Sequence, residues 1–182
     1  MSKKGTVVLG VTGSIAAHKA IDLASLLTRE GCEVHAILTA HARRFVTALP
    51  FQTLTRQPVI TDLFDEEESW RPTHIRLADE ADLLIVAPAT AHCLAKLALG
   101  LADDALSCVA LALNERARLL IAPAMHGRMW EHPATQQHVA TLEARGAIFA
   151  GPERGLLSCG YEGVGRLLSV EALAQQALKL LG

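Results

Sequence analysis

Short apolar runs alternate along the chain with segments whose apolar residues recur at helical spacing. The runs Thr6–Val11, Glu33–Leu38, Ala81–Ala87 and Arg118–Ala122 are mostly apolar, which is typical of strands buried on both faces of a sheet. Between the first two runs, Ile15–Glu30 gathers its apolar residues on one helical face, and Gly31 follows it as glycine often follows a helix. The pattern therefore predicts an alternation of strands and helices.

The same alternation continues to the end of the chain. Further helices are predicted at Ala91–Leu99, Asp104–Leu113, Ala134–Arg145 and Val170–Leu181, with a short strand at Ala147–Ala150. Apolar strands separated by helices indicate a parallel sheet covered on both faces, and we expect residues 1–182 to form one α/β domain. Ligands of such sheets bind beyond the carboxyl ends of the strands.

Two segments do not fit the alternation. Gln57–Pro72 is polar and acidic and is predicted to be a surface loop. Gly151–Gly165 is rich in glycine and is predicted to be a long loop, of the kind that often covers a functional site.

Composition narrows the functional classes. The chain has 182 residues, 51% of them hydrophobic and 20% charged, with a formal net charge of -2. This suits one globular domain and gives no reason to expect nucleic acid or an anionic membrane as a partner. The apolar run near the N-terminus is too short for a signal peptide, and no stretch is long enough to span a bilayer, so we expect a cytoplasmic protein.

The four cysteines are Cys32, Cys93, Cys108 and Cys159. None forms a CxxC pair, so neither a zinc site nor any other metal site is predicted. Cys93 and Cys108 lie in apolar helical segments and are predicted to be packing residues, and disulfides are not expected in a reducing compartment.

The first strand-to-helix connection, Gly10–Ser14, is a candidate anion site. A glycine turn at the start of a helix presents free backbone N–H groups to a phosphate. The Walker and GxGxxG patterns are absent, so one phosphate, as in FMN, fits better than two. Capping of the helix by Ser14 explains the pattern equally well. Thr39, after the second strand, is either a second contact or a cap.

Two further strand ends carry candidate chemistry. Pro88–Cys93 is built from small residues that would let a flat ring approach the backbone, although a tight turn with Thr90 as helix cap is the alternative. Pro123–Trp130 places Met125 and Met129 beside His126, and core packing would explain the methionines equally well.

His74 and Cys159 are candidate proton-transfer groups. A lone histidine is more often structural than catalytic. A cysteine among glycines can donate a proton to a reaction intermediate, and an incidental exposed thiol is the alternative.

Five ordered segments together resemble the flavin-dependent cysteine decarboxylase family, also called the HFCD flavoproteins. They are VLGVTGSIAAHKA, HIRLADEADLLIVAPATA, LAKLALGLADDALS, APAMHGRMWEHPAT and LLSCGYEGVGRL, and they cover nearly the whole chain. The resemblance implies a three-layer αβα domain, Rossmann- or flavodoxin-like, with a mainly parallel sheet. It also implies FMN as cofactor.

The resemblance assigns roles to particular positions. The implied FMN-binding residues are Gly13, Ser14, Ile15, Thr39, Thr90, Ala91, His92, Cys93 and Ala124. His74 matches the active-site histidine and Cys159 the proton-donating cysteine. Met125, His126 and Met129 match the segment that binds the substrate carboxylate. The family more often has asparagine in place of His126, and Asn-Thr in place of His92-Cys93.

The implied activity is decarboxylation of 4'-phosphopantothenoylcysteine to 4'-phosphopantetheine in coenzyme A biosynthesis. In this reaction the cysteine thiol is oxidised, carbon dioxide is lost and the product is reduced, with Cys159 supplying a proton. Family members that act on peptide cysteines stop at the enethiol, so Cys159 favours the coenzyme A branch. A peptidyl-cysteine decarboxylase of lantibiotic type and a non-catalytic flavin-binding regulatory subunit are the alternatives.

The resemblance also implies a homo-oligomer, either a trimer or a dodecamer. The family places FMN near a subunit interface, so His74 is expected to serve the site of a neighbouring subunit.

Overall fold

The centre of the molecule is a five-stranded parallel sheet. The computed structural model describes residues 4–64, 70–158 and 160–182. The strands are β1 (Gly5–Val11), β2 (Cys32–Leu38), β3 (Leu83–Ala89), β4 (Arg118–Pro123) and β5 (Ile148–Phe149), in the order β2-β1-β3-β4-β5. All pair in parallel, which confirms the predicted sheet. This order is flavodoxin-like, and the chain reverses its direction of winding between β1 and β3.

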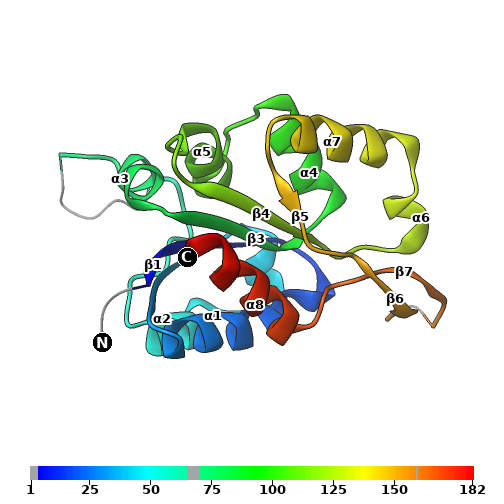
Figure 1. The fold of residues 1–182 in the computed structure, drawn as a ribbon, viewed down its shortest axis with the longest axis horizontal. Coiled ribbons are helices and arrows are strands. Elements are labelled where there is room, and N and C mark those ends of the chain that lie inside the picture. The colour runs from blue at the N-terminus through cyan, green and yellow to red at the C-terminus, as the bar shows by residue number, and fades with distance from the viewer. Residues whose placement is uncertain (1–3, 65–69, 159) are drawn as a thin grey trace.

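Helices cover both faces of the sheet (Figure 1). One layer holds α1 (Lys19–Arg29), α2 (Ala48–Thr55) and α8 (Val170–Leu181). The other holds α3 (Thr73–Glu80), α4 (Ala91–Leu99), α5 (Ala105–Ala112) and α7 (Pro133–Ala144). The predicted three-layer αβα architecture is therefore confirmed.

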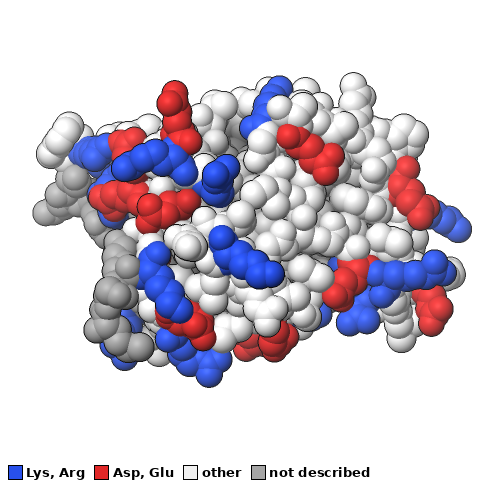
Figure 2. Space-filling model, viewed as in Figure 1, with Lys and Arg blue, Asp and Glu red and all other residues white. Residues whose placement is uncertain are grey.

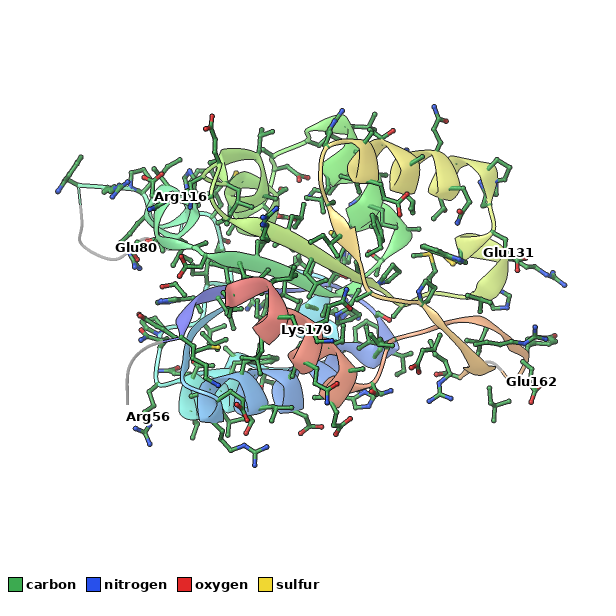
Figure 3. All side chains as sticks on the ribbon, viewed as in Figure 1. Arg56, Glu80, Arg116, Glu131, Glu162 and Lys179 are labelled. Atoms are coloured by element: carbon green, nitrogen blue, oxygen red, sulfur yellow. The ribbon has the colours of Figure 1, made fainter. Side chains whose placement is uncertain are left out.

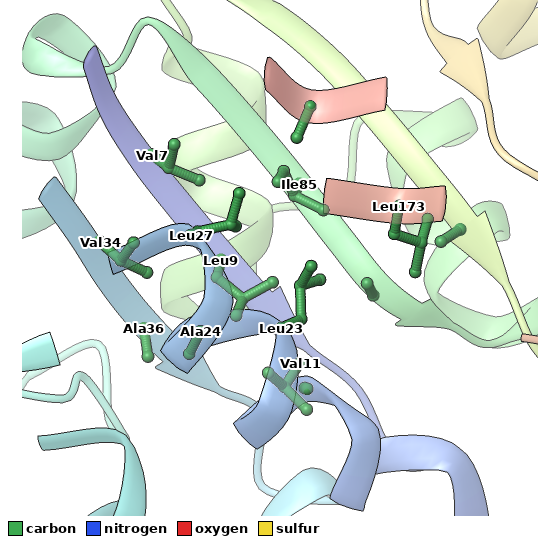
Figure 4. Close-up of a cluster of buried hydrophobic side chains, with 14 of the residues drawn as sticks. Val7, Leu9, Val11, Leu23, Ala24, Leu27, Val34, Ala36, Ile85 and Leu173 are labelled. Carbon is green, nitrogen blue, oxygen red and sulfur yellow. The ribbon is translucent and has the colours of Figure 1, made fainter. Parts of the chain in front are cut away.

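The strands divide the core into two clusters because successive side chains point to opposite faces. Val7 and Leu9 of β1 pack with α1 and α8, while Val8 between them packs against the opposite helices. Figure 4 shows the first cluster, in which Leu23 of α1 and Leu173 of α8 close over the strands. β3 is buried over its whole length and β1 over all but its first residue, which explains why their sequences are mostly apolar.

The predicted helix Ile15–Glu30 is divided in two. Ile15–His18 forms a short 3-10 helix, η1, and α1 then runs from Lys19 to Arg29. Ser14 caps η1, with its hydroxyl accepting a hydrogen bond from the Ala16 N–H at 3.3 Å. The tighter first turn satisfies the N–H groups left over at a helix start.

The prediction of a long loop at Gly151–Gly165 was wrong. Strands β6 (Glu153–Leu156) and β7 (Glu162–Arg166) form an antiparallel hairpin in this region. The hairpin is joined to the main body where the Met125 N–H donates to the Gly165 carbonyl at 3.0 Å. A side chain at Gly165 would place its Cβ 2.1 Å from the Met125 carbonyl oxygen, so only glycine allows this approach.

The region Gln57–Pro72 is not wholly irregular. Ile60 forms a parallel bridge with Ile37 of β2, and its backbone bonds to Ala36 and Leu38 at 3.0 and 2.9 Å. The remaining short elements are η2 (Ala42–Arg44) and α6 (Gly127–Trp130), which, like α2, the apolar pattern did not predict.

The two ends of the sheet carry different elements. Figure 3 shows Glu131, after α6, and Glu162 of the hairpin at the carboxyl end, and Glu80 of α3 at the opposite end. On the face in Figure 2, side chains of both signs are interspersed and form no large patch of one sign. Within the described residues, no helix has both the length and the apolar character needed to cross a membrane.

Candidate functional site

A cavity of about 510 Å³ lies beyond the carboxyl ends of β1, β3 and β4. Its size falls within the roughly 300–1,000 Å³ range of small-molecule sites, and it lies at the switch point where open α/β sheets bind ligands. Residues from the three strand ends and the hairpin line it: Gly13, Ser14, Ile15, Ala16, His18, Lys19, Thr90, Ala124, Met125, His126, Met129, Leu156, Leu157, Ser158, Gly165, Arg166 and Leu167. The structure thus brings together most of the predicted site.

The turn after β1 is tightly packed at one side of the cavity. A Cβ at Gly13 would lie 2.4 Å from the Cβ of His41, so the backbone passes where no other residue fits. Ser14 donates from its hydroxyl to the Ala124 carbonyl at 3.3 Å, in addition to capping η1. The predicted capping role of Ser14 is therefore confirmed, and the same hydroxyl joins two strand ends.

Hydrogen bonds hold the turns after β1 and β3 against each other. The Thr12 hydroxyl donates to the Pro88 carbonyl at 2.6 Å and accepts from the Thr90 N–H at 3.2 Å. Thr90 caps α4 by accepting from the Cys93 N–H at 3.2 Å, as predicted. These hydrogen bonds fix the backbone of the two turns, which are built from small residues. Thr90 lines the cavity on this side.

The side chains after Thr90 do not line the cavity. Cys93 is buried, which raises the pKa of its thiol to about 12 and confirms its predicted packing role. The His92 ring lies edge-on to that of His41, with 6.3 Å between the ring centroids. Ala91 begins α4 outside the lining.

Thr39 also lies outside the lining of the cavity. Its hydroxyl accepts from the Ala42 N–H at 3.2 Å, at the start of η2. This contact is the capping role that sequence reasoning had left open.

The segment after β4 forms the floor of the cavity. Here Nδ1 of His126 accepts a hydrogen bond from the Arg128 N–H at 3.2 Å. In the neutral ring the proton then lies on Nε2, so His126 presents an N–H donor. The ring also lies edge-on to Tyr161 of the hairpin region, with 6.0 Å between centroids. Met125 and Met129 line the same cavity, and Met129 is 50% exposed.

Three partly exposed apolar side chains surround the cavity. They are Ile15 from η1, Met129 from α6 and Leu156 from β6, which are 60%, 50% and 64% exposed. Exposed apolar groups that gather at one opening favour binding of a ligand or of another protein surface there.

Neither of the two predicted proton-transfer residues is among the described residues that line this cavity. Cys159 lies outside the described residues, although Ser158, which precedes it, lines the cavity. His74 lies in the first turn of α3. Figure 1 shows α3 at the end of the sheet opposite the hairpin, so His74 is remote from the cavity of its own chain.

Sequence reasoning missed three basic residues of the lining. His18 and Lys19 come from the junction of η1 and α1, and Arg166 ends β7. Spacing along the chain could have indicated Lys19, because it follows the predicted site residue Ser14 by little more than one helical turn.

A second cavity, of about 320 Å³, lies between α4, α5 and α7. Its most unusual group is Lys96, which is only 7% exposed and pairs with Asp103 and Asp104. Burial alone would lower the pKa of Lys96, but hydrogen bonds to the two carboxylates outweigh it and raise that pKa. Asp104 also caps α5, so this cluster has a structural role.

Comparisons with known proteins identify the family of this chain. The chain matches the model of the family described as Flavoprotein over residues 1–182, and it therefore belongs to that family. It is 45% identical over 179 residues to the coenzyme A biosynthesis bifunctional protein CoaBC of Bacillus subtilis, a match that covers 98% of this chain and 44% of that protein. It is 40% identical over 176 residues to the probable phosphopantothenoylcysteine decarboxylase of Streptococcus mutans, covering 97% of each.

Solved structures give the same result. A PPC decarboxylase variant complexed with pantothenoylaminoethenethiol superposes with a TM-score of 0.84 at 31% identity, covering 96% of this chain and 97% of that one. The FMN-dependent cysteine decarboxylase SpaF gives a TM-score of 0.83 at 30% identity, covering 97% of both chains. The predicted family resemblance is confirmed.

Proposed function

We propose that this chain is an FMN-dependent decarboxylase that converts 4'-phosphopantothenoylcysteine to 4'-phosphopantetheine. The observation that carries the proposal is the cavity at the β1/β3 switch point, which unites the predicted cofactor turns with the predicted substrate segment. The match to the Streptococcus mutans relative over 97% of both chains supports the choice of substrate.

The residues present fit FMN. Gly13–Ile15 forms the turn at the start of η1, where Gly13 adds no side chain and backbone N–H groups suit one phosphate. Thr90 and Ala124 present small side chains from two adjacent strand ends, which leaves room for a flat ring. Ala91, His92 and Cys93 lie outside the lining at the start of α4, so any contact that they make with FMN would come from the main chain.

FMN supplies the oxidation of the substrate thiol to a thioaldehyde, which makes the adjacent carboxylate easy to lose, and the later reduction. His126 then has a defined role in the reaction. Its Nε2–H points a donor at a substrate carboxylate, as an asparagine amide would, while Nδ1 is held by Arg128. This donor orients the carboxylate without requiring a charge on the ring.

Met125 and Met129 lie beside this donor and provide an apolar surface in the same cavity. An apolar surface around a carboxylate favours its loss as neutral carbon dioxide, because water that would stabilise the charged ground state is excluded.

The remote position of His74 supports a homo-oligomer, either a trimer or a dodecamer. A histidine at one end of the sheet reaches a cavity at the other end only in a neighbouring subunit. The apolar side chains of Ile15, Met129 and Leu156 around the cavity support a subunit contact there. In this assembly His74 assists proton removal during the oxidation, and Cys159 donates the proton that completes the product.

The test is to purify the protein, record its absorption spectrum, and incubate it with 4'-phosphopantothenoylcysteine while following carbon dioxide and product mass. A flavin spectrum with formation of 4'-phosphopantetheine is the expected result. The Cys159→Ser variant is expected to release carbon dioxide and stop at the enethiol. A flavin-containing protein that leaves this substrate unchanged would refute the proposal.

A further inference from the structure

The lining of the main cavity is biased in charge. His18, Lys19 and Arg166 contribute basic side chains, and no acidic side chain of the described residues contributes to it. The chain as a whole has 17 Lys and Arg against 19 Asp and Glu, so the presence of Lys19 and Arg166 without an acidic residue is a property of this site and not of the composition. A cavity lined in this way attracts anionic ligands.

Arg166 is directed by the glycines of the hairpin. If Gly155 carried a Cβ, that atom would lie 2.6 Å from Nη1 and 2.9 Å from Cδ of Arg166. The arginine side chain thus crosses β6 over a position without a side chain, and it reaches the cavity from the hairpin side. Among the described residues it forms no ion pair.

Lys19 lines the same cavity from the start of α1. It is the first residue of α1, is partly buried, and forms no ion pair within the described part of the chain. Placing two unpaired cations at one cavity is unfavourable for the folded protein because they repel each other. A bound dianion would remove that repulsion.

The proposed reaction leaves one anionic group without a partner. The cofactor phosphate has the turn Gly13–Ile15, and the reacting carboxylate has His126. The substrate also carries a phosphate monoester at its far end. We propose that Arg166 and Lys19 bind this phosphate and make the enzyme select phosphorylated over unphosphorylated substrate.

This inference rests on the proposed function. Arginine suits the role because its planar guanidinium donates two parallel hydrogen bonds to phosphate oxygens, and lysine adds a point charge.

The experiment compares 4'-phosphopantothenoylcysteine with pantothenoylcysteine as substrates of the FMN-loaded full chain. Arg166→Gln and Lys19→Gln are each expected to raise KM for the phosphorylated substrate by about 10- to 100-fold, the loss of a hydrogen bond to a charged group. KM for the unphosphorylated substrate and the flavin absorbance per protein are expected to stay unchanged.

Two further variants sharpen the test. Arg154→Gln removes the same charge from an exposed position on β6 outside the cavity and is expected to change neither KM. Gly155→Ala keeps all charges but displaces the Arg166 side chain, and it is expected to raise KM for the phosphorylated substrate alone, by less than Arg166→Gln does.

Three results would overturn the inference. An equal loss with both substrates would assign Arg166 to the carboxylate, loss of flavin would assign it to the cofactor phosphate, and unchanged KM values would remove its role altogether. Calorimetric titration with 4'-phosphopantetheine and pantetheine separates this inference from the proposed function. If the wild type turns over neither substrate but binds the phosphorylated compound more tightly, and Arg166→Gln abolishes the difference, the function fails and the inference stands.

Discussion

The contact between the hairpin and the sheet rests on one glycine, and Gly165→Ala tests it. The Cβ of alanine would lie 2.1 Å from the Met125 carbonyl oxygen, whereas Cβ atoms in proteins stay beyond about 3 Å from such atoms. The hairpin must therefore move away by roughly 1 Å. That movement breaks the hydrogen bond from the Met125 N–H to the Gly165 carbonyl, which is 3.0 Å long.

The energy of this change can be bounded. Moving the hairpin away relieves the steric overlap but loses the backbone hydrogen bond, so the two costs are not added and the net cost is about 1–3 kcal/mol. Because the hairpin can separate without unfolding the sheet, we expect the loss to appear as local opening before it appears in global stability. Each 1.4 kcal/mol corresponds to about a tenfold change in an opening equilibrium.

Hydrogen exchange at the Met125 amide is the direct assay. In Gly165→Ala its protection is expected to fall by about tenfold to a hundredfold, and turnover is expected to fall because the hairpin carries part of the cavity wall. Gly163→Ala is the matched control in the same strand, since its Cβ would lie 3.8 Å from Leu157 in ordinary contact. Equal protection in the two variants would refute the reasoning.

Three other outcomes follow from the buried polar groups. Burial holds the pKa of Cys93 at about 12, so this thiol is expected to resist iodoacetamide at pH 8 in the folded protein and to react only after unfolding, as peptide mass spectrometry will show. Lys96→Met is expected to lower the free energy of unfolding by about 1–3 kcal/mol at pH 7. Burial would raise the pKa of Asp104, but its bonds to Lys96 and Ser107 lower it, so this stabilisation is present above the ordinary aspartate pKa and is lost as pH falls. Denaturant titrations of variant and wild type should therefore converge below about pH 4. Asn114→Ala removes the side-chain amide whose two N–H groups are shared among three carbonyls at the end of α3, at 2.8–3.1 Å, and urea unfolding should show a loss of about 1–3 kcal/mol.

The sheet was predictable because its strands satisfy a simple rule. β1, β3 and most of β4 are buried on both faces, so their sequences are mainly apolar without alternation, and a proline lies at or next to the end of β3 and β4. α2 escaped prediction because Ala48–Thr55 contains a proline in its first turn and carries threonines, which weaken the helical signal.

The hairpin escaped prediction for a different reason. Glycine usually marks loops, but here Gly155 and Gly163 face each other across β6 and β7, and Gly165 permits close contact with the floor. A sequence shows the glycines but not the atoms that approach them.

Site residues that directly follow a strand could be predicted from the sequence. Site residues that reach the cavity only through tertiary contacts were missed. Gly13, Ser14, Thr90 and Ala124 follow predicted strands, so their meeting at one edge could be expected. Arg166 reaches the cavity only because the hairpin folds back, which no local pattern encodes.

The hairpin also bears on how this fold acquires new substrates. β6 and β7 pair with each other and with no strand of the main sheet, so the order of the five central strands does not depend on them. A two-stranded ribbon has little stability of its own and takes its position from the surface on which it rests. Residues 153–166 can therefore be exchanged as a unit during evolution, altering what the enzyme accepts while the cofactor turns and the folding core stay as they are.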